Sequence, residues 1–281
     1  MQQEGYWVVR TYEAGPVGEK TKFFVPGTRP TGKTRRRERM EIKKQEQNEY
    51  SAIKSLARLL NANFTDGDFL LGLDYSPEGM DRIADWGRKK ELEVDSQDEA
   101  VCMDAMRICA EHALDNALRR VKYRLDKMGI ELKAAYVTSD MDGETGESVR
   151  VHHHLVINRE ARDAFVDAWD KYGHCAWSSL WEYQLDRTQL AEYLIRQVRR
   201  VPDAKKYRST RNLIRPQPKD RVALGDSEIR LPKGAALLYR QEFKPGRPQY
   251  IRYAIQGTAY RARPATASAG PCNDRSSPEG M

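Results

Sequence analysis

The stretch Val151-His152-His153-His154-Leu155-Val156-Ile157 is the most informative part of this sequence. Its apolar residues are typical of a β-strand, in which successive side chains point to opposite faces. His152 and His154 therefore share one face, whereas His153 lies on the other face with the apolar residues. The two same-face imidazoles stand about 6–7 Å apart at their backbones and can converge on one cation. The stretch predicts a metal-binding strand; a chance polar patch or hydrogen-bonded core histidines are the alternatives.

The composition indicates a polyanionic partner. The 281 residues include 48 Lys and Arg against 41 Asp and Glu, which gives a formal net charge of +7 and a pI near 9.1. Nucleic acid is favoured over a membrane surface, because no basic amphipathic helix stands apart from the globular pattern. The length and the 40% of hydrophobic residues allow one large domain, or a core domain with appendages.

Neither a membrane anchor nor a disulfide framework is expected. No apolar run approaches the ~20 residues that span a bilayer, and the first residues lack the regions of a signal peptide, so the protein is expected to be cytoplasmic. The four cysteines are scattered without C-x-x-C spacing: Cys102, Cys109, Cys175 and Cys272. Zinc-knuckle and disulfide-stabilised classes are therefore not indicated.

Hydrophobic periodicity predicts an α+β fold. Hairpins are expected over 6–26 and 237–255, because each alternates around a Pro-Gly or Gly-Pro turn. Between them the pattern predicts helices over 49–62, 95–127, 159–172 and 188–201, and strands over 68–75, 132–138, 151–157 and 175–183. Pro77-Glu78-Gly79 interrupts this pattern, and Gly129 is the expected stop of the long helix. The order predicts an antiparallel sheet with packed helices and the histidine strand at its centre.

The same pattern divides the chain into four parts. An N-terminal hairpin and basic arm (1–48) precede a core domain (49–222), which is followed by a C-terminal β extension (223–262) and a tail (263–281). The tail is rich in Ala, Ser, Pro and Gly and is expected to be disordered.

Gly27-Thr28-Arg29-Pro30-Thr31-Gly32-Lys33-Thr34 matches the phosphate-binding pattern G-x-x-x-x-G-K-[ST]. Such a loop follows a buried strand and opens a helix with an apolar face, whereas here Arg35-Arg36-Arg37 follows and a proline stiffens the loop. In its favour, Phe69-Leu70-Leu71-Gly72-Leu73-Asp74 resembles an apolar strand that ends in a magnesium-binding Asp. A P-loop nucleotide-triphosphatase is therefore one alternative function.

The helix over 188–201 carries a second group of functional candidates. Tyr193, Gln197 and Arg200 lie at i, i+4 and i+7 on one face, with Arg196 beside them. A tyrosine flanked by guanidinium groups is suited to attack a phosphate. A core-edge tyrosine with an exposed hydroxyl is the structural alternative.

Two basic segments are candidates for contact with nucleic acid. Both are short of apolar residues, so they suit contacts with phosphates, although a solvated charge run is the alternative for the arm. The candidates are Arg35, Arg36 and Arg37 in the arm, and Lys205, Lys206, Arg208 and Arg211 after the last helix.

The histidine strand resembles the His-hydrophobic-His motif of HUH endonucleases, the rolling-circle replication initiators of plasmids and phages. Three features follow the family's order: the segment 69–76 resembles the first, strand motif, the histidine strand resembles the second, and 192–197 resembles the third, which carries the nucleophilic tyrosine. The resemblance covers residues 50–215. Two positions depart from the family pattern, namely His153 between the two ligands and Arg196 in place of a lysine.

The resemblance implies a ferredoxin- or RRM-like core and a metal-dependent enzyme that nicks and rejoins single-stranded origin DNA. Tyr193 would attack the phosphate and leave a 5′-phosphotyrosine, and Arg196 or Arg200 would offset the developing charge. The pKa of a phenol is about 10, so the metal or a base must help to remove the proton of Tyr193. Gln197 occupies the position of a second tyrosine, which indicates the single-tyrosine subtype.

The metal implied by the resemblance is Mg²⁺ or Mn²⁺, held by His152 and His154. Two imidazoles alone make a weak site for such a cation, so a third ligand is expected, and Asp140 is the first candidate. A tight hairpin would keep Asp140 far along the strand from His152, and Asp140 reaches the metal only if residues 141–150 bulge out. Glu144 and Glu147 are the other candidates, and solvated turn acids are the structural alternative.

The rival from another class is a non-catalytic DNA-binding regulator on the same scaffold, whose histidines hold a structural ion or none. For the enzyme, strand transfer would need a second protomer in a homodimer, a second round of binding or the new 3′-hydroxyl. No helicase domain is visible after residue 222, so unwinding is expected to depend on a host helicase.

Overall fold

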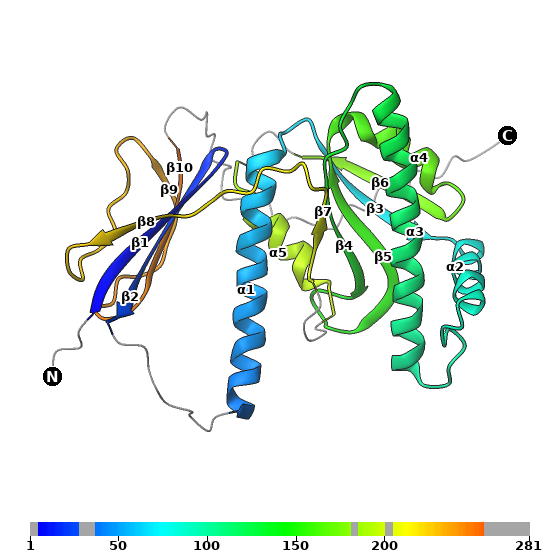
Figure 1. Cartoon of the computed structure of the whole chain (residues 1–281), viewed down its shortest axis with the longest axis horizontal. Coiled ribbons are helices and arrows are strands. Elements are labelled where there is room, and N and C mark those ends of the chain that lie inside the picture. Colours follow the sequence, from blue (N-terminus) through cyan, green and yellow to red (C-terminus); the bar gives the residue numbers. More distant parts are fainter. Residues whose placement is uncertain (1–4, 28–36, 181–184, 200–204, 256–281) are drawn as a thin grey trace, which may run out of the picture.

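The computed structural model describes residues 5–27, 37–180, 185–199 and 205–255. Within them, two antiparallel sheets and five α-helices form an α+β fold, as predicted (Figure 1). The predicted disordered tail lies outside the described residues. In the described part of the chain, no helix is long and apolar enough to cross a membrane.

The histidine strand is the middle strand of one of two five-stranded sheets, as predicted, and we call this sheet the histidine sheet. This sheet has the order β6-β3-β5-β4-β7, and every neighbouring pair is antiparallel. Its strands are β3 (Phe69–Tyr75), β4 (Ala134–Met141), β5 (Ser148–Ile157), β6 (Gly173–Ser179) and β7 (Arg208–Ser209). The first motif strand, β3, thus lies directly beside the histidine strand, β5.

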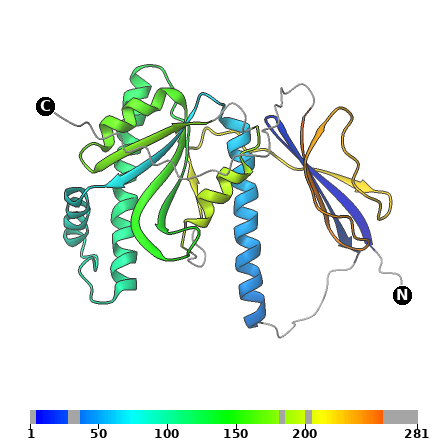
Figure 2. The same cartoon turned by 180° about the vertical axis from the view of Figure 1, so that it is seen from behind.

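Helices cover both faces of this sheet (Figures 1 and 2). The core on one face includes Leu155 and Ile157 of β5, and the core on the other face includes Val156. The first face packs against α2 (Pro77–Lys89), α3 (Glu99–Lys127) and α4 (Arg162–Trp169), and the second against α1 (Arg37–Asn63) and α5 (Thr188–Arg196). Neighbouring residues of β5 therefore belong to different cores.

Helix α2 begins at the proline that the sequence pattern marks as an interruption. Proline is favoured at the first helical position, because its missing N–H has no intrahelical partner there. The Ser76 side chain accepts a hydrogen bond from the Gly79 N–H at 3.0 Å and caps the helix. The predicted stop of the long helix is confirmed, since α3 ends at Lys127 and Gly129 adopts a left-handed φ of 71°.

The second sheet joins the two ends of the described chain. The predicted hairpins are confirmed as β1 (Gly5–Ala14) with β2 (Val17–Pro26), and as β9 (Ala236–Arg240) with β10 (Gln249–Ala254). β10 also pairs with β2, and β8 (Lys219–Ala223) pairs with β1, so the order is β8-β1-β2-β10-β9. We call this five-stranded unit the terminal sheet. It unites segments that the division of the sequence placed in three different parts.

Cationic side chains of α1 hold the terminal sheet against the rest of the molecule. Arg58 donates two hydrogen bonds, of 2.7 and 3.0 Å, to Glu19 Oε2 and lies 3.6 Å from the centroid of the Tyr12 ring. Lys54 Nζ lies 3.5 Å from the centroid of the Tyr250 ring, and burial lowers the pKa of this amine to about 8. Charged hydrogen bonds and cation–π contacts therefore dock the sheet on α1.

The Glu19 carboxylate makes this interface sensitive to the loss of its partner. Glu19 is only 2% exposed, so Arg58→Ala leaves a buried charge without its guanidinium. We expect the free energy of unfolding to fall by about 3–5 kcal/mol in urea denaturation. Arg120→Ala on the exposed side of α3 is the control and should change it by less than about 0.5 kcal/mol. Equal effects of the two substitutions would contradict the role of this ion pair.

Candidate active site

His153 is a core residue. The side chain is buried on the face of the sheet that α3 covers. There the ring hydrogen-bonds to the Tyr75 hydroxyl at 2.8 Å and to the Thr138 hydroxyl at 3.1 Å. Burial, followed by the neighbouring histidines, lowers the pKa of His153 to about 3, so the ring is neutral. Both ring nitrogens are used within the core, which leaves His153 no atom for a ligand. The predicted distribution of the three histidines over two faces is confirmed.

His152 and His154 lie on the opposite face and turn their Nε2 atoms towards each other, 3.1 Å apart. Two nitrogen ligands that bind one ion at about 2.1 Å and at a right angle are about 3 Å apart, so this spacing fits a shared cation. His152 Nδ1 donates to the Arg150 carbonyl oxygen at 3.0 Å, which directs Nε2 outward. Burial, followed by His152, lowers the pKa of His154 to about 4, so the neutral, ligating form prevails.

Two oxygen donors lie near this pair. Gln197 Oε1 is 2.9 Å from His154 Nε2, so the amide of the residue that caps the end of α5 reaches the imidazoles. Asp74 stands next to His152 on the same face of the sheet, because its neighbour Leu73 pairs with His153. Nitrogen and hard oxygen donors together suit Mg²⁺ or Mn²⁺. In the described residues, however, no three His, Cys, Asp or Glu side chains already lie together as a metal site.

Asp74 is a partner of the histidines that the sequence did not predict, since its position suggested a role only in the nucleotide alternative. The feature of the sequence that could have indicated this role is the position of Asp74 near the end of the first motif strand. Which residue of β3 lies opposite His152 depends on the register between the strands, and no local pattern fixes that register.

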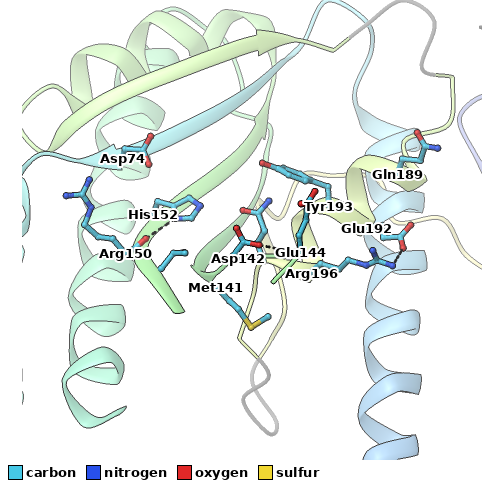
Figure 3. Close-up of a pocket in the computed structure, with 13 residues that line it drawn as sticks. Asp74, Met141, Asp142, Glu144, Arg150, His152, Gln189, Glu192, Tyr193 and Arg196 are labelled. Atoms are coloured by element: carbon cyan, nitrogen blue, oxygen red, sulfur yellow. Dashed lines mark hydrogen bonds and ion pairs between the residues drawn. The ribbon is translucent and has the colours of Figure 1, made fainter. Parts of the chain in front are cut away.

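Tyr193 lines a pocket that His152 also lines. The pocket has a volume of about 690 Å³ and is lined by Asp74, His152, Tyr193 and Gln197 among others. The Tyr193 ring packs edge-on against His154 with 5.6 Å between centroids and remains 50% exposed. Figure 3 shows its hydroxyl end directed to the side where Asp74 and His152 lie. The structure thus brings the predicted tyrosine and the predicted histidines together.

The lining of this pocket carries more negative than positive charge. Its carboxylates are Asp74, Asp142, Glu144 and Glu192, and its guanidinium groups are Arg150 and Arg196. Arg196 forms an ion pair with Glu192 and points away from His152 in Figure 3. Asp142 caps the β4–β5 turn, where backbone hydrogen bonds from Thr145 and Glu144 lower its pKa. A phosphate in this pocket therefore needs an additional positive charge.

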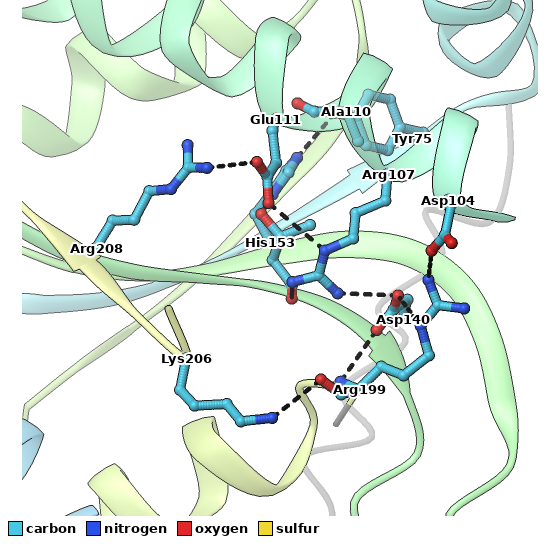
Figure 4. Close-up of polar contacts among 11 residues, drawn as sticks. Tyr75, Asp104, Arg107, Ala110, Glu111, Asp140, His153, Arg199, Lys206 and Arg208 are labelled. Carbon is cyan, nitrogen blue, oxygen red and sulfur yellow. Dashed lines mark hydrogen bonds and ion pairs between the residues drawn. The ribbon is translucent and has the colours of Figure 1, made fainter. Parts of the chain in front are cut away.

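Of the three candidates for a third ligand, only Glu144 lines the pocket. Asp140 is buried elsewhere: its carboxylate pairs with Arg107 at 2.9 Å and with Arg199 at 3.4 Å (Figure 4). Asp140 is not too far from His152 along the strand to reach a shared metal. The pairing of β4 with β5 shifts register after Ser139, and Ser139 lies opposite His152. Asp140 is the next residue and points to the α3 side. The expectation that it joins the histidines is therefore not met.

Ion pairs hold both ends of α5. Before its first turn, Asp186 accepts hydrogen bonds from the Thr188 N–H and hydroxyl, and it pairs with Arg252 of β10 at 2.6 Å. Beyond its last turn, the Arg199 N–H donates to Asp140 Oδ1 at 3.3 Å. The helix that carries Tyr193 is thereby connected to the terminal sheet at one end and to the histidine sheet at the other.

The predicted DNA-contacting residues are scattered or outside the described part. Arg35 and Arg36 lie outside the described residues, as does the side chain of Arg37 at the start of α1; the catalytic candidate Arg200 also lies outside them. Lys205 and Arg211 are exposed. Arg208 pairs with Glu111 and Lys206 donates to the Arg199 carbonyl oxygen, so both are also parts of the network in Figure 4.

The two parts of the nucleotide-binding alternative belong to different sheets. The phosphate-loop pattern follows β2 of the terminal sheet, and its Lys33 and Thr34 lie outside the described residues. Asp74 is on β3 of the histidine sheet. Strand pairing therefore does not bring Asp74 beside the strand that precedes the loop, as a P-loop site would require.

Comparison of the chain with protein-family models, with curated proteins and with solved structures found no match.

The two faces of β5 predict opposite effects of histidine substitutions. His152→Ala and His154→Ala should abolish Mn²⁺ binding in calorimetric titration with little change in stability. His153→Leu should keep Mn²⁺ affinity but lower the free energy of unfolding by about 1–3 kcal/mol, because the Tyr75 and Thr138 hydroxyls lose their buried partner. Loss of Mn²⁺ binding in His153→Leu alone would show that the metal face is the other one.

Asp140→Asn separates a ligand from a positioning residue. A lost metal ligand would weaken Mn²⁺ binding by about 10–100-fold or more. Because Asp140 contacts Arg107 and Arg199, we instead expect unchanged Mn²⁺ affinity and a loss of about 3 kcal/mol in unfolding free energy. His152→Ala serves as the control that does lose the metal. Loss of Mn²⁺ binding in both variants would show that Asp140 is a metal ligand.

Proposed function

We propose that this protein is a metal-dependent, HUH-type endonuclease that nicks single-stranded origin DNA through a 5′-phosphotyrosine and rejoins it, which initiates rolling-circle replication. The observation that carries the proposal is the packing of Tyr193 against His154, with 5.6 Å between the ring centroids, next to a pocket that Tyr193 and His152 both line. These residues come from different elements, β5 and α5, and converge only in the fold.

The reaction requires one bond to form as another breaks. Tyr193 Oη forms the bond to phosphorus and loses its proton to an acceptor in the pocket, while the bond from phosphorus to the 3′ oxygen breaks. The 3′ oxygen takes up a proton and leaves as a hydroxyl. In the rejoining step, a 3′-hydroxyl attacks the phosphotyrosine, and Tyr193 regains its proton. Asp74 and His152 line the pocket on the side of the tyrosine hydroxyl and are the candidate proton acceptors.

His152 and His154 would hold the divalent cation, and the oxygen donors Gln197 and Asp74 lie beside them. When bound, Mg²⁺ or Mn²⁺ supplies Lewis-acid polarisation of the phosphate and compensates the excess of carboxylates in the pocket. Arg196 offsets charge on the phosphate only after it leaves Glu192. The resemblance suggests a homodimer or successive turnovers for strand transfer, and a host helicase for unwinding.

The excess of carboxylates also favours the alternative, a DNA-binding regulator without catalytic activity. An acidic pocket repels the DNA backbone unless a cation occupies it. In such a regulator, DNA would bind elsewhere on the surface and Tyr193 would be an exposed edge residue. Covalent capture of DNA decides between these two functions.

The deciding experiment uses a randomised pool of single-stranded oligonucleotides, because the origin sequence is unknown. With Mn²⁺, the wild-type protein should form an adduct that survives denaturing electrophoresis, and sequencing of the captured strands should reveal a common cleavage site. Tyr193→Phe should form no adduct, because it lacks the oxygen that attacks phosphorus. Tyr123→Phe, on an exposed tyrosine of α3, is the matched control and should retain the adduct.

Absence of an adduct with Mg²⁺, Mn²⁺ and the complete pool would reject the enzyme in favour of the regulator. An adduct that persists in Tyr193→Phe would place the nucleophile elsewhere. ATP turnover that is lost in Lys33→Ala, in a protein that forms no adduct, would support the nucleotide-triphosphatase.

A further inference from the structure

Positive charge is concentrated away from the candidate active site. The terminal sheet with its connections, residues 5–27 and 219–255, contains 11 Lys and Arg against 6 Asp and Glu. The described residues between 37 and 199 contain 24 Lys and Arg against 30 Asp and Glu. The surface that attracts a polyanion is therefore on the terminal sheet and the segment that leads to it, and not on the unit that contains Tyr193.

Four cations of the terminal sheet are exposed and have no acidic partner within ion-pair distance among the described residues: Arg221, Arg230, Lys233 and Arg247. Other cations of this sheet are paired, for example Arg10 with Asp220 at 2.6 Å. We call the four unpaired residues the outer cations. Their charges face solvent without compensation, which is the arrangement that binds phosphates.

The outer cations surround one side of the sheet. Tyr250 of β10 faces Lys54 of α1, so its neighbour Ile251 points to the opposite side, where it packs with Ile229. Arg230 and Lys233 follow Ile229 in the β8–β9 connection, which Figures 1 and 2 show on the side of the sheet away from α1.

The remaining two outer cations border this connection. Arg221 on β8 is close enough to Lys20 to lower the pKa of that amine, after the larger effect of burial, and Lys20 donates to the Arg230 carbonyl oxygen at 3.2 Å. Arg247 lies in the β9–β10 turn, where the Gly246 N–H donates to Asp226 Oδ2 at 2.5 Å. Strand pairing and loop contacts thus gather charges from three parts of the sequence.

We propose that the outer cations bind the phosphate backbone of duplex DNA next to the nicking site. The partner's identity as DNA rests on the proposed function. Duplex is favoured over single-stranded DNA, because no exposed large aromatic side chain lies in the two connections that carry these residues, and single strands are usually held by base stacking on such rings. Arg252 links the sheet to Asp186 before α5, so DNA held by the sheet has a fixed position relative to Tyr193.

The test neutralises the outer cations in the full chain, as R221Q/R230Q/K233Q/R247Q. Binding to a duplex of about 30 base pairs and arbitrary sequence is measured by fluorescence anisotropy over a range of NaCl concentrations. Each lost phosphate contact lowers the slope of log K against log salt by about 0.9, so we expect a decrease of about 3–4 and a loss of affinity of at least about tenfold at low salt. Adduct formation with a saturating short single strand should be unchanged, because Tyr193 and the histidines are intact.

The matched control K89Q/K90Q/R120Q/K127Q removes the same charge from exposed positions on and beside α2 and α3 and should keep the wild-type slope. The proposal is overturned if the wild type does not bind duplex, if the outer-cation variant keeps the wild-type slope, or if the control loses as much. Equal loss for single-stranded DNA would overturn the preference for duplex. A duplex effect as expected, in a protein that forms no adduct, would reject the proposed enzyme and leave the binding surface standing.

Discussion

The alternation of β5 between two cores determines the role of each histidine. Leu155 and Ile157 belong to the core under α3, and Val156 belongs to the core under α5, so the strand cannot slip by one residue without burying its polar face. In this register, His153 satisfies the Tyr75 and Thr138 hydroxyls inside the protein. His152 and His154 are left at the rim of the α5 side, where their nitrogens converge. Core packing and candidate metal binding are thus two results of one constraint.

The position of Tyr193 depends on charges that are not part of its pocket. Asp140 is 3% exposed and is shared by two arginines, one from α3 and one from the segment after α5. A buried carboxylate is stable in this setting only while its partners remain, so the ion pairs restrict where α5 ends. Asp186 restricts where α5 begins, because it pairs with Arg252 just before the first turn. A tyrosine that must align with a phosphate benefits from a helix held at both ends.

Local patterns in the sequence were sufficient for the larger elements. Period-two alternation identified the two hairpins and the faces of the histidine strand, and helical periodicity identified α3 and α5, because these signals depend only on neighbouring residues. The terminal sheet could not be predicted, since β10 pairs with β2 across almost the whole chain. The same limit explains Asp74 and Asp140. Each is a carboxylate near the end of a strand, and only the register and the facing helix decide which one reaches His152.

The distribution of charge separates the two tasks of the proposed enzyme. A pocket with more carboxylates than guanidinium groups does not attract DNA over long range, but it favours a divalent cation. A phosphate would then bind in the pocket only next to that cation. In the proposed enzyme, attraction of DNA would then be left to exposed arginines and lysines of the terminal sheet, whose effect does not depend on a particular base sequence. Because Arg252 belongs to that sheet and pairs with Asp186, just before α5, the part proposed to gather DNA would also help to fix the part proposed to cut it. The described segments near the two ends of the chain, 5–27 and 219–255, would therefore serve the proposed site although neither lines the pocket.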